Sequence, residues 1–249
     1  VRDDMLLMAN STQIILVDLN SPGQIKTAFP VENPSKVSFV SDDRFAVVEN
    51  GQVRYWSFEG VELDGPKATE NDSVLLFESS DDLIALVFNS DPDSVHIGIV
   101  DGEGLIAINI NATANPIEDE ILENSGFTVD LENATITDVA IYENKLAVTI
   151  DVNATSRLIL LDTNTGDSQI ISDPKYAAYD PNMGHGILMF SAYQNIDPTN
   201  ASIKETDREI MIHDLNSNLT TQLTADELDQ WGPVVLKDHF VYQQLSENG

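Results

Sequence analysis

The sequence contains no cysteine in 249 residues, so no disulfide stabilises the fold and no thiol can act as a nucleophile or metal ligand. Basic residues are scarce: 12 Lys and Arg stand against 42 Asp and Glu, giving a formal net charge of −30 at pH 7. A protein that binds nucleic acids or anionic membranes needs a positively charged surface. We therefore expect neither as a partner. A cationic protein partner or bound divalent ions fit the charge, as does solubility alone in a medium of high ionic strength.

Long apolar runs are also missing. No stretch approaches the roughly 18 residues of a membrane-spanning helix, so this segment is not expected to insert into a membrane. The chain starts at Val1 without the charged and apolar regions of a secretion signal. We expect it to be either a mature form or part of a longer chain.

The residue patterns of familiar active sites are absent. There is no Gly-x-Ser-x-Gly elbow, and the four histidines, His96, His185, His213 and His239, lack zinc-site spacing. Gly102-Glu-Gly104-Leu-Ile-Ala107 has the outline of a dinucleotide fingerprint, but β-branched residues follow where a helix should begin. We expect a hairpin turn at Asp101–Gly104, and neither a catalytic site nor an organic cofactor.

What the sequence does contain is an internal repeat. The segment from Arg157 to Ser191 returns without a gap from Glu209 to Gln243. Five pairs share the offset of 52: Asp162 with Asp214, Asn164 with Asn216, Ser172 with Thr224, Pro181 with Pro233, and Phe190 with Tyr242. Each copy has an apolar strand, an Asp-x-Asn turn, a strand ending in Ser or Thr, a polar loop, and Pro before two short apolar strands. Such a unit is typical of one four-stranded blade of a β-propeller.

The rest of the chain continues the pattern of short apolar strands. Asn50-Gly51 between two apolar runs predicts a tight antiparallel hairpin. At roughly 40 to 45 residues per blade, the chain supplies five to six blades in one all-β domain, residues 1–249. Two excursions are expected, at about 111–134, with a short helix at Pro116–Gly126, and at 195–207. The first blade lacks its first strand and the last its third and fourth, so we expect part of a larger ring.

The repeat residues LILLDTNTGDSQIISD…AYDP…GILMFSAY and EIMIHDLNSNLTTQLTA…DQWGPVV…HFVYQQ resemble the TolB-like (WD40-like) family of β-propeller repeats. The matching positions are Asp162, Thr165, Gly166, Ile171, Ser172, Asp214, Leu215, Gln222, Leu223, Thr224, Asp229, Gln230 and Pro233. The match covers about residues 157–245 well and is recognisable around 14–34. Between 37 and 149 it rests on strand spacing, and at Ser57 the turn Asp is absent.

The resemblance implies a non-catalytic propeller of an exported or cell-surface protein. Such a domain would serve protein–protein interaction or scaffolding, including self-assembly at a cell surface, and its acidic loops would supply the contact surface. Similar repeats form the gating domain of prolyl oligopeptidase-like hydrolases. The alternative is therefore an accessory domain of such a hydrolase, whose catalytic domain is not in this chain.

Export would fit the number of Asn-x-Ser/Thr sequons. Seven are present where composition predicts about three by chance, although a turn-rich β-protein places these residues together in any case. The candidate glycosylation sites are Asn10, Asn71, Asn111, Asn133, Asn153, Asn200 and Asn218.

Four aromatic residues next to predicted loops, Trp56, Tyr176, Tyr179 and Trp231, are candidates for an interaction surface. The alternative is that they pack between blades. Calcium is the one cofactor to weigh, because Asp-x-Asn at 18, 162 and 214 supplies oxygens and would suit a calcium-stabilised adhesion unit. The same pattern also forms Asx turns, with the Asp capping its own hairpin and the Asn in left-handed geometry, and we favour that interpretation.

Overall fold

The structure is a computed structural model that describes residues 5–21, 25–67, 72–80, 82–100, 104–109, 134–152, 155–172, 176–194, 208–226 and 228–245. All regular elements in these ranges are β-strands, as the sequence predicts. The chain divides into two compact units, Val1–Ile108 and Asn109–Gly249. Apart from Ala134, both expected excursions, including the helix, lie outside the described residues.

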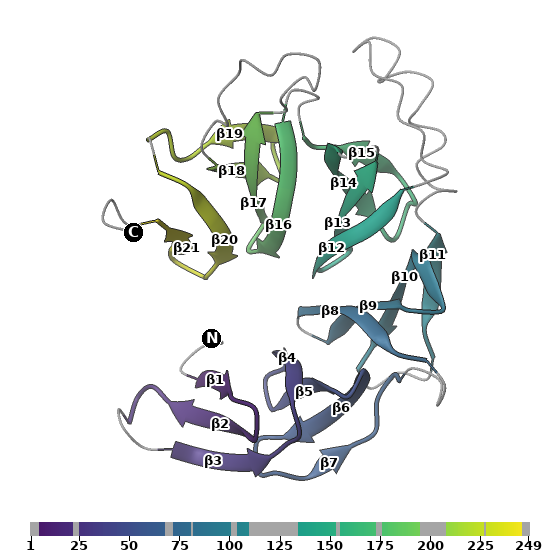
Figure 1. Cartoon of the computed structure of the whole chain (residues 1–249), viewed down its shortest axis with the longest axis vertical. Coiled ribbons are helices and arrows are strands. Elements are labelled where there is room, and N and C mark those ends of the chain that lie inside the picture. Colours follow the sequence, from purple (N-terminus) through teal and green to yellow (C-terminus); the bar gives the residue numbers. More distant parts are fainter. Residues whose placement is uncertain are drawn as a thin grey trace. The chain divides into compact units, whose positions relative to one another are not determined.

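Unit 1 contains three antiparallel sheets in which consecutive strands are neighbours (Figure 1). The sheets have three, four and four strands. The strands are β1 (Met5–Ala9), β2 (Gln13–Asp18) and β3 (Ile25–Pro30); β4 (Pro34–Ser41), β5 (Arg44–Glu49), β6 (Gln52–Ser57) and β7 (Glu62–Leu63); and β8 (Val74–Ser80), β9 (Leu83–Phe88), β10 (Asp91–Ile99) and β11 (Ile106–Asn109). The first strands of neighbouring sheets lie side by side, β1 with β4 and β4 with β8.

Two local features of unit 1 test the predicted turns. Asn50 and Gly51 have φ values of 51° and 76°, which confirms the hairpin between β5 and β6. Asp91-Pro-Asp93 has the composition of a turn, but Asp91 already pairs with Phe88 at the start of β10. The turn is therefore at the two residues between β9 and β10, and the pairing of β10 with β9 shifts at a bulge between Asp91 and His96.

Unit 2 contains two four-stranded sheets and one two-stranded sheet of the same kind (Figure 1). Its strands are β12 (Thr135–Tyr142), β13 (Lys145–Val152), β14 (Thr155–Asp162) and β15 (Ser168–Ile170); β16 (Tyr176–Gly184), β17 (Ile187–Gln194), β18 (Glu209–Asp214) and β19 (Leu219–Gln222); and β20 (Gln230–Val235) and β21 (Phe240–Gln244). Again the first strands are neighbours, β12 with β16 and β16 with β20.

The apolar cores of both units lie between neighbouring sheets. In unit 1, Phe29 and Phe45 join the first two sheets, and Tyr55 packs in the core shared by the second and third. In unit 2, Leu158 and Phe190 meet between the first two sheets. The middle strands read as continuous apolar runs because both of their faces are buried. In the described part of the chain no helix is long and apolar enough to span a membrane.

Candidate functional site

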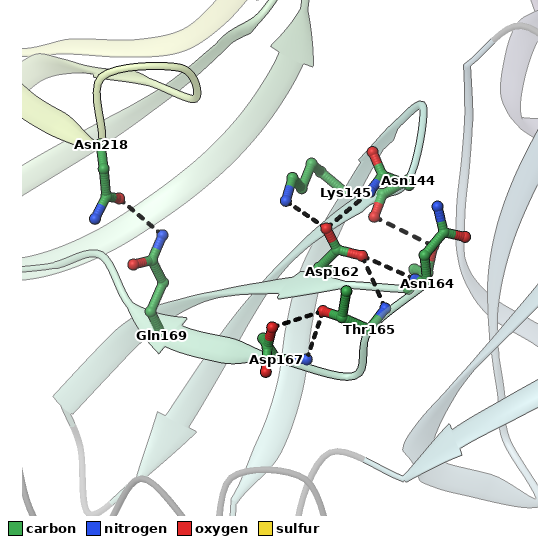
Figure 2. Close-up of polar contacts among 9 residues, drawn as sticks. Asn144, Lys145, Asp162, Asn164, Thr165, Asp167, Gln169 and Asn218 are labelled. Atoms are coloured by element: carbon green, nitrogen blue, oxygen red, sulfur yellow. Dashed lines mark hydrogen bonds and ion pairs between the residues drawn. The ribbon is translucent and has the colours of Figure 1, made fainter.

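The repeated Asp-x-Asn segments form Asx turns. The Oδ1 atom of Asp162 accepts hydrogen bonds from the backbone N–H groups of Asn164, at 2.9 Å, and Thr165, at 3.1 Å (Figure 2). The Oδ1 atom of Asp214 accepts the equivalent bonds, from the amides two and three residues later, at 2.8 and 2.9 Å. At Asp18 the first of these bonds is also present, at 2.9 Å. The Asx-turn interpretation is confirmed.

The left-handed residue of these turns is not where the sequence suggested. The positive φ was expected at the Asn of Asp-x-Asn, but it falls four residues after the Asp, at Gly166 (79°) and at the equivalent Asn218 (56°). The N–H of each donates to the carbonyl of its Asp, at 2.8 and 2.9 Å. Gly and Asn are the residues that adopt this geometry most readily, so both copies make the same turn.

Asp162 also links two turns of its sheet, as Figure 2 shows. Its Oδ2 atom accepts hydrogen bonds from Lys145 Nζ at 2.6 Å and Asn144 Nδ2 at 2.8 Å, both next to the β12–β13 turn. The bond from the Lys145 ammonium, together with those from the turn amides, holds the pKa of Asp162 far below its ordinary value. Gln169 Nε2 donates to Asn218 Oδ1 at 2.9 Å, which joins this sheet to the next. This end of the sheet is stabilised by contacts within the chain.

Hydroxyl groups cap strand edges at equivalent positions. Ser172 Oγ accepts a hydrogen bond from the N–H of Leu158 at 3.2 Å, and Thr224 Oγ1 accepts one from the N–H of Ile210 at 2.8 Å. Where the turn Asp is absent, Ser57 Oγ accepts from the amides two and four residues later, at 3.2 and 3.3 Å. Ser57 therefore replaces the Asp of the other turns.

The repeated prolines mark β-bulges. The pairing of β16 with β17 shifts between Tyr179 and Asn182, and that of β20 with β21 shifts between Trp231 and Val234. In each bulge the residue before proline is left-handed, Asp180 at φ 52° and Gly232 at 57°. A bulge bends its strand and redirects the side chains beside it. The bulge at Asp180 thus shapes the surroundings of Tyr179.

Tyr179 forms a stacked pair with Tyr193. The ring centroids are 5.2 Å apart with an interplanar angle of 7°, and the two hydroxyl oxygens lie 3.0 Å apart. Burial raises the pKa of Tyr179, and the hydrogen bond with Tyr193 and the negative charge of Asp151 raise it further. The Tyr179 hydroxyl is therefore protonated at neutral pH, and the pair offers aromatic surface and hydroxyl groups.

Arg208 lies against this pair. Its guanidinium carbon is 5.5 Å from the Tyr179 ring centroid and 5.7 Å from that of Tyr193, within the range of cation–π attraction. Its Nη1 atom is 3.6 Å from Asp180 Oδ2, which also accepts a hydrogen bond from Ser191 Oγ at 2.7 Å. The side chains of Arg208 and Asp180 are 35% and 37% exposed. We call Tyr179, Asp180, Ser191, Tyr193 and Arg208 the tyrosine cluster.

Buried side-chain oxygens lie on the strands next to the cluster: Asp151 Oδ1 and Thr149 Oγ1 have no hydrogen-bond partner, whereas the Ser156 hydroxyl interacts with that of Tyr179. Asp151 Oδ1 and Ser156 Oγ belong to residues that face each other across β13 and β14, so both side chains are on one face of the sheet. Thr149, two residues before Asp151, has a third such oxygen on that face. Ser156 and Thr149 are fully buried. Buried polar atoms normally have hydrogen-bond partners, so Asp151 Oδ1 and Thr149 Oγ1 are exceptions.

The other predicted aromatic residues are not brought together as one surface. Trp56 is in unit 1 and packs against Phe29, with ring centroids 6.0 Å apart, between two sheets. Tyr176 contributes to the core between the first two sheets of unit 2, and its carbonyl accepts a bond from Arg157 at 2.9 Å. Trp231 is half-buried in β20, beside the bulge. An interaction role for these residues remains a prediction.

Only two candidate glycosylation sites lie in the described residues, and both are exposed. Asn10 Oδ1 accepts a bond from the N–H of Thr12 at 2.9 Å, and Asn218 is in the turn already described. The other sites, Asn71, Asn111, Asn133, Asn153 and Asn200, lie outside the described residues. Within the described ranges, no group of three or more acidic or histidine side chains could hold a metal ion. The segment Ile106–Asn109 is a strand, which confirms that no helix follows the glycines of the fingerprint-like segment.

Sequence reasoning missed most of the tyrosine cluster. Only Tyr179 was a candidate, whereas Asp180, Ser191, Tyr193 and Arg208 were not. The signal available was a rare arginine in an acidic chain directly before an apolar strand. The arginine contacts the tyrosine pair beside the bulge at Asp180, and the Asp180-Pro181 sequence alone does not predict that bulge.

Comparison with known proteins defines the fold. No protein-family model and no curated protein sequence matches the chain. Among solved structures, it is similar to the β-propeller domain of the Trilobed protease from Pyrococcus furiosus (TM-score 0.56, 16% identity), covering 86% of this chain and 58% of that one. The match therefore spans less than two thirds of that domain.

Two further structures are similar at about the same level. One is a putative TolB from Agrobacterium tumefaciens, with a TM-score of 0.52, 9% identity, and 84% and 68% of the two chains covered. The other belongs to an S. cerevisiae complex of Dbp5 bound to Nup159 and Gle1, with a TM-score of 0.51, 9% identity, and 97% and 68% covered. The chain has the β-propeller fold, and its resemblance to the TolB-like repeats is confirmed at the level of that fold.

Proposed function

We propose that the chain is a non-catalytic β-propeller domain that binds a protein partner through the tyrosine cluster end of unit 2. The observation that carries the proposal is the cluster itself, in which stacked aromatic rings, an arginine and a carboxylate are half-exposed at one place. Aromatic residues and arginine are the side chains most enriched at the energetic centres of protein interfaces. The opposite end of the same sheets uses its polar side chains for internal turns.

The comparisons and the composition support the proposal in different ways. A similar structure occurs in a complex with protein partners, Dbp5 with Nup159 and Gle1. The net charge of −30 favours a cationic partner, and a further copy of the chain at a cell surface is the alternative occupant. We assign the domain to an exported or cell-surface protein because of its sequons and its TolB-like repeats. Intact mass of protein from the native source tests this location, since absence of added sugar would remove its main support.

A second candidate function is an accessory domain of a peptidase. It is favoured by the similarity to the propeller domain of the Trilobed protease. In that role the same end of the unit would face a catalytic domain. The two candidates differ in the identity of the partner and not in the surface used.

Site-specific photo-crosslinking tests the surface. A photoreactive phenylalanine replaces Tyr176, which is at the cluster end of the first strand of its sheet, or Tyr142, which is at the opposite end of β12. Both are half-buried aromatic residues packed on the same core, so they are matched controls. We expect a partner to crosslink from position 176 and not from 142. Equal crosslinking from both positions, or from neither, would contradict the proposal, and a peptidase as partner would favour the second candidate.

A further inference from the structure

Two arginines of the chain lie against aromatic rings and are similarly exposed. The guanidinium carbon of Arg54 is 5.0 Å from the ring centroid of Trp56, and that of Arg208 is 5.5 and 5.7 Å from those of Tyr179 and Tyr193. The two arginine side chains are 37% and 35% exposed. Arg54 therefore shows what an arginine supported in this way binds when carboxylates are within reach.

The two guanidinium groups differ in their hydrogen bonds. Arg54 donates from Nε and Nη2 to the two carboxylate oxygens of Glu62, at 2.9 and 2.8 Å, and from Nη1 to Glu49 at 2.6 Å. The Arg208 Nη1 atom is 3.6 Å from Asp180 Oδ2, which is beyond hydrogen-bond distance. Within the described residues, the side chain of Arg208 makes no hydrogen bond. Its N–H groups can therefore donate to a ligand.

Arg208 is held in place without using these donors. Its backbone N–H donates to Asp229 Oδ1 at 2.7 Å, and the tyrosine pair supports the guanidinium. Asp180 is held separately, because its Oδ2 atom accepts from Ser191 Oγ at 2.7 Å and from the N–H of Gly232 at 3.4 Å. A ligand of Arg208 therefore breaks no hydrogen bond of Asp180. A side chain that is already positioned also loses little conformational freedom on binding.

The chemistry of Arg208 selects one kind of ligand. A guanidinium presents five N–H donors in a flat fork, which matches the two oxygens of a carboxylate. A phosphate group fits the same fork but brings about two negative charges, which the nearby Asp180 and the net charge of −30 would repel more strongly. A carboxylate brings one. We therefore expect a carboxylate, placed on a partner that can be basic elsewhere.

We propose that Arg208 binds a carboxylate of the protein partner through two parallel hydrogen bonds, as Arg54 binds Glu62, while the tyrosine pair holds the guanidinium in position. This inference rests on the proposed function, because it specifies the partner chemistry of the same surface. The carboxylate belongs to an acidic side chain or to a chain terminus. A basic partner thus gains affinity from one negative group at this place, although the net charge of the chain opposes it.

NMR titration of the whole chain with short peptides at 0.15 M salt tests the proposal, with the arginine Nε–H resonances as the readout. The probes are a Lys-Gly-Glu-Gly-Lys peptide blocked at both ends and the same peptide with Gln in place of Glu. We expect the Glu peptide to bind about threefold more tightly, the size of an exposed ion pair. Net charge alone predicts the reverse, because the Gln peptide is the more positive. The Arg208 resonance should shift and that of Arg54, whose donors are occupied, should not.

A third peptide separates the two sources of the carboxylate. Lys-Gly-Lys-Gly, blocked only at its N-terminus, has the same net charge as the Glu peptide but carries its carboxylate at the chain end. Tighter binding of this peptide than of the Glu peptide would assign the site to a chain terminus, and weaker binding to an acidic side chain. Either order supports the site if the Arg208 resonance shifts.

Two variants of Arg208 and one control complete the test. R208Q should abolish the preference for the Glu peptide, and R208K, which keeps the charge but lacks the fork, should lose most of it. The control K237Q removes one charge from an exposed lysine of unit 2 and should keep the preference. Circular dichroism verifies that the variants fold. Equal or tighter binding of the Gln peptide to the wild type, or a preference that survives R208Q, would overturn the proposal. Crosslinking from position 176 without a preference for the Glu peptide would leave the proposed function standing and refute the carboxylate site alone.

Discussion

Replacing Asp162 by alanine removes all the contacts that this carboxylate makes in Figure 2. The turn amides of Asn164 and Thr165 lose their acceptor, which resembles the loss of a helix cap and costs about 1 kcal/mol. The bonds from Lys145, at 2.6 Å, and Asn144, at 2.8 Å, are lost as well. A partly exposed ion pair contributes up to about 1 kcal/mol. We expect D162A to lower the free energy of unfolding of unit 2 by about 2 kcal/mol.

Urea unfolding followed by Trp231 fluorescence measures this loss. A Trp56→Phe background removes the only other tryptophan, so the signal reports unit 2. D162N keeps the Oδ1 acceptor of the turn but removes the charge, and it should lose about half as much as D162A. D214A is the matched control in the next repeat, because the hydrogen bonds described for Asp214 come from its own turn. Its loss should be the smaller of the two alanine variants.

The pH dependence of the D162N effect checks the electrostatic part of the argument. The pKa of Asp162 is lowered in the folded state from an ordinary value of 3.8. The charge therefore stabilises the fold fully above about pH 4, and this stabilisation is lost as pH falls through the folded pKa. The gap between wild type and D162N should shrink at low pH. A gap that stays constant from pH 3 to pH 7, or equal losses in D162A and D214A, would refute the reasoning.

Three other predictions follow from single contacts. Ser57→Ala should destabilise unit 1 by about 1 kcal/mol in urea unfolding, whereas Ser57→Asp, which restores the residue of the other turns, should not. Gly51→Ala should destabilise it by 1 kcal/mol or more, because Gly51 has φ 76° and a Cβ there would be 2.8 Å from Ser73 Cβ. Burial lowers the pKa of His213 from 6.5, so stability should fall below about pH 6.5 as the unfolded chain takes up the proton first. His213→Leu, which copies Leu161 of the other repeat, should reduce that loss between pH 7.5 and 5.5; an unchanged slope would exclude His213 as its source.

The repeat made much of unit 2 predictable because its shared residues shape the backbone at turns, strand edges and bulges. Asp162 and Asp214 cap turns, Ser172 caps a strand edge, and the prolines at 181 and 233 follow left-handed residues in bulges. These roles depend on residues close in sequence, so a pattern at one offset reveals them. The location of the left-handed residue was missed because it lies four residues after the Asp, two residues beyond the Asn of the Asp-x-Asn pattern.

The tyrosine cluster was not predictable in the same way. Tyr179 and Tyr193 meet because they are diagonal neighbours in the β16–β17 pairing, and that register shifts at the bulge after Tyr179. Arg208 reaches them from the start of another strand, and Asp151 belongs to a different sheet. Such neighbours are set by how sheets pack, which alternation of apolar and polar residues does not encode. In the sequence, Asp151 and Ser156 show only that they flank the hairpin between β13 and β14.

The Asp180 bulge has a consequence for how the last hairpin of unit 2 opens. Two side chains of β16 accept hydrogen bonds from the backbone of β20, as a paired strand would. Asn182 Oδ1 accepts from the N–H of Val235 at 2.8 Å, and Asp180 Oδ2 accepts from the N–H of Gly232 at 3.4 Å. These bonds tie β20 to the second sheet, whereas every residue of β21 is exposed. Amide hydrogens of β20 should therefore exchange only with larger openings of unit 2, while β21 can separate alone. We therefore expect one strand of the hairpin to share the stability of its neighbour and the other to open independently of it.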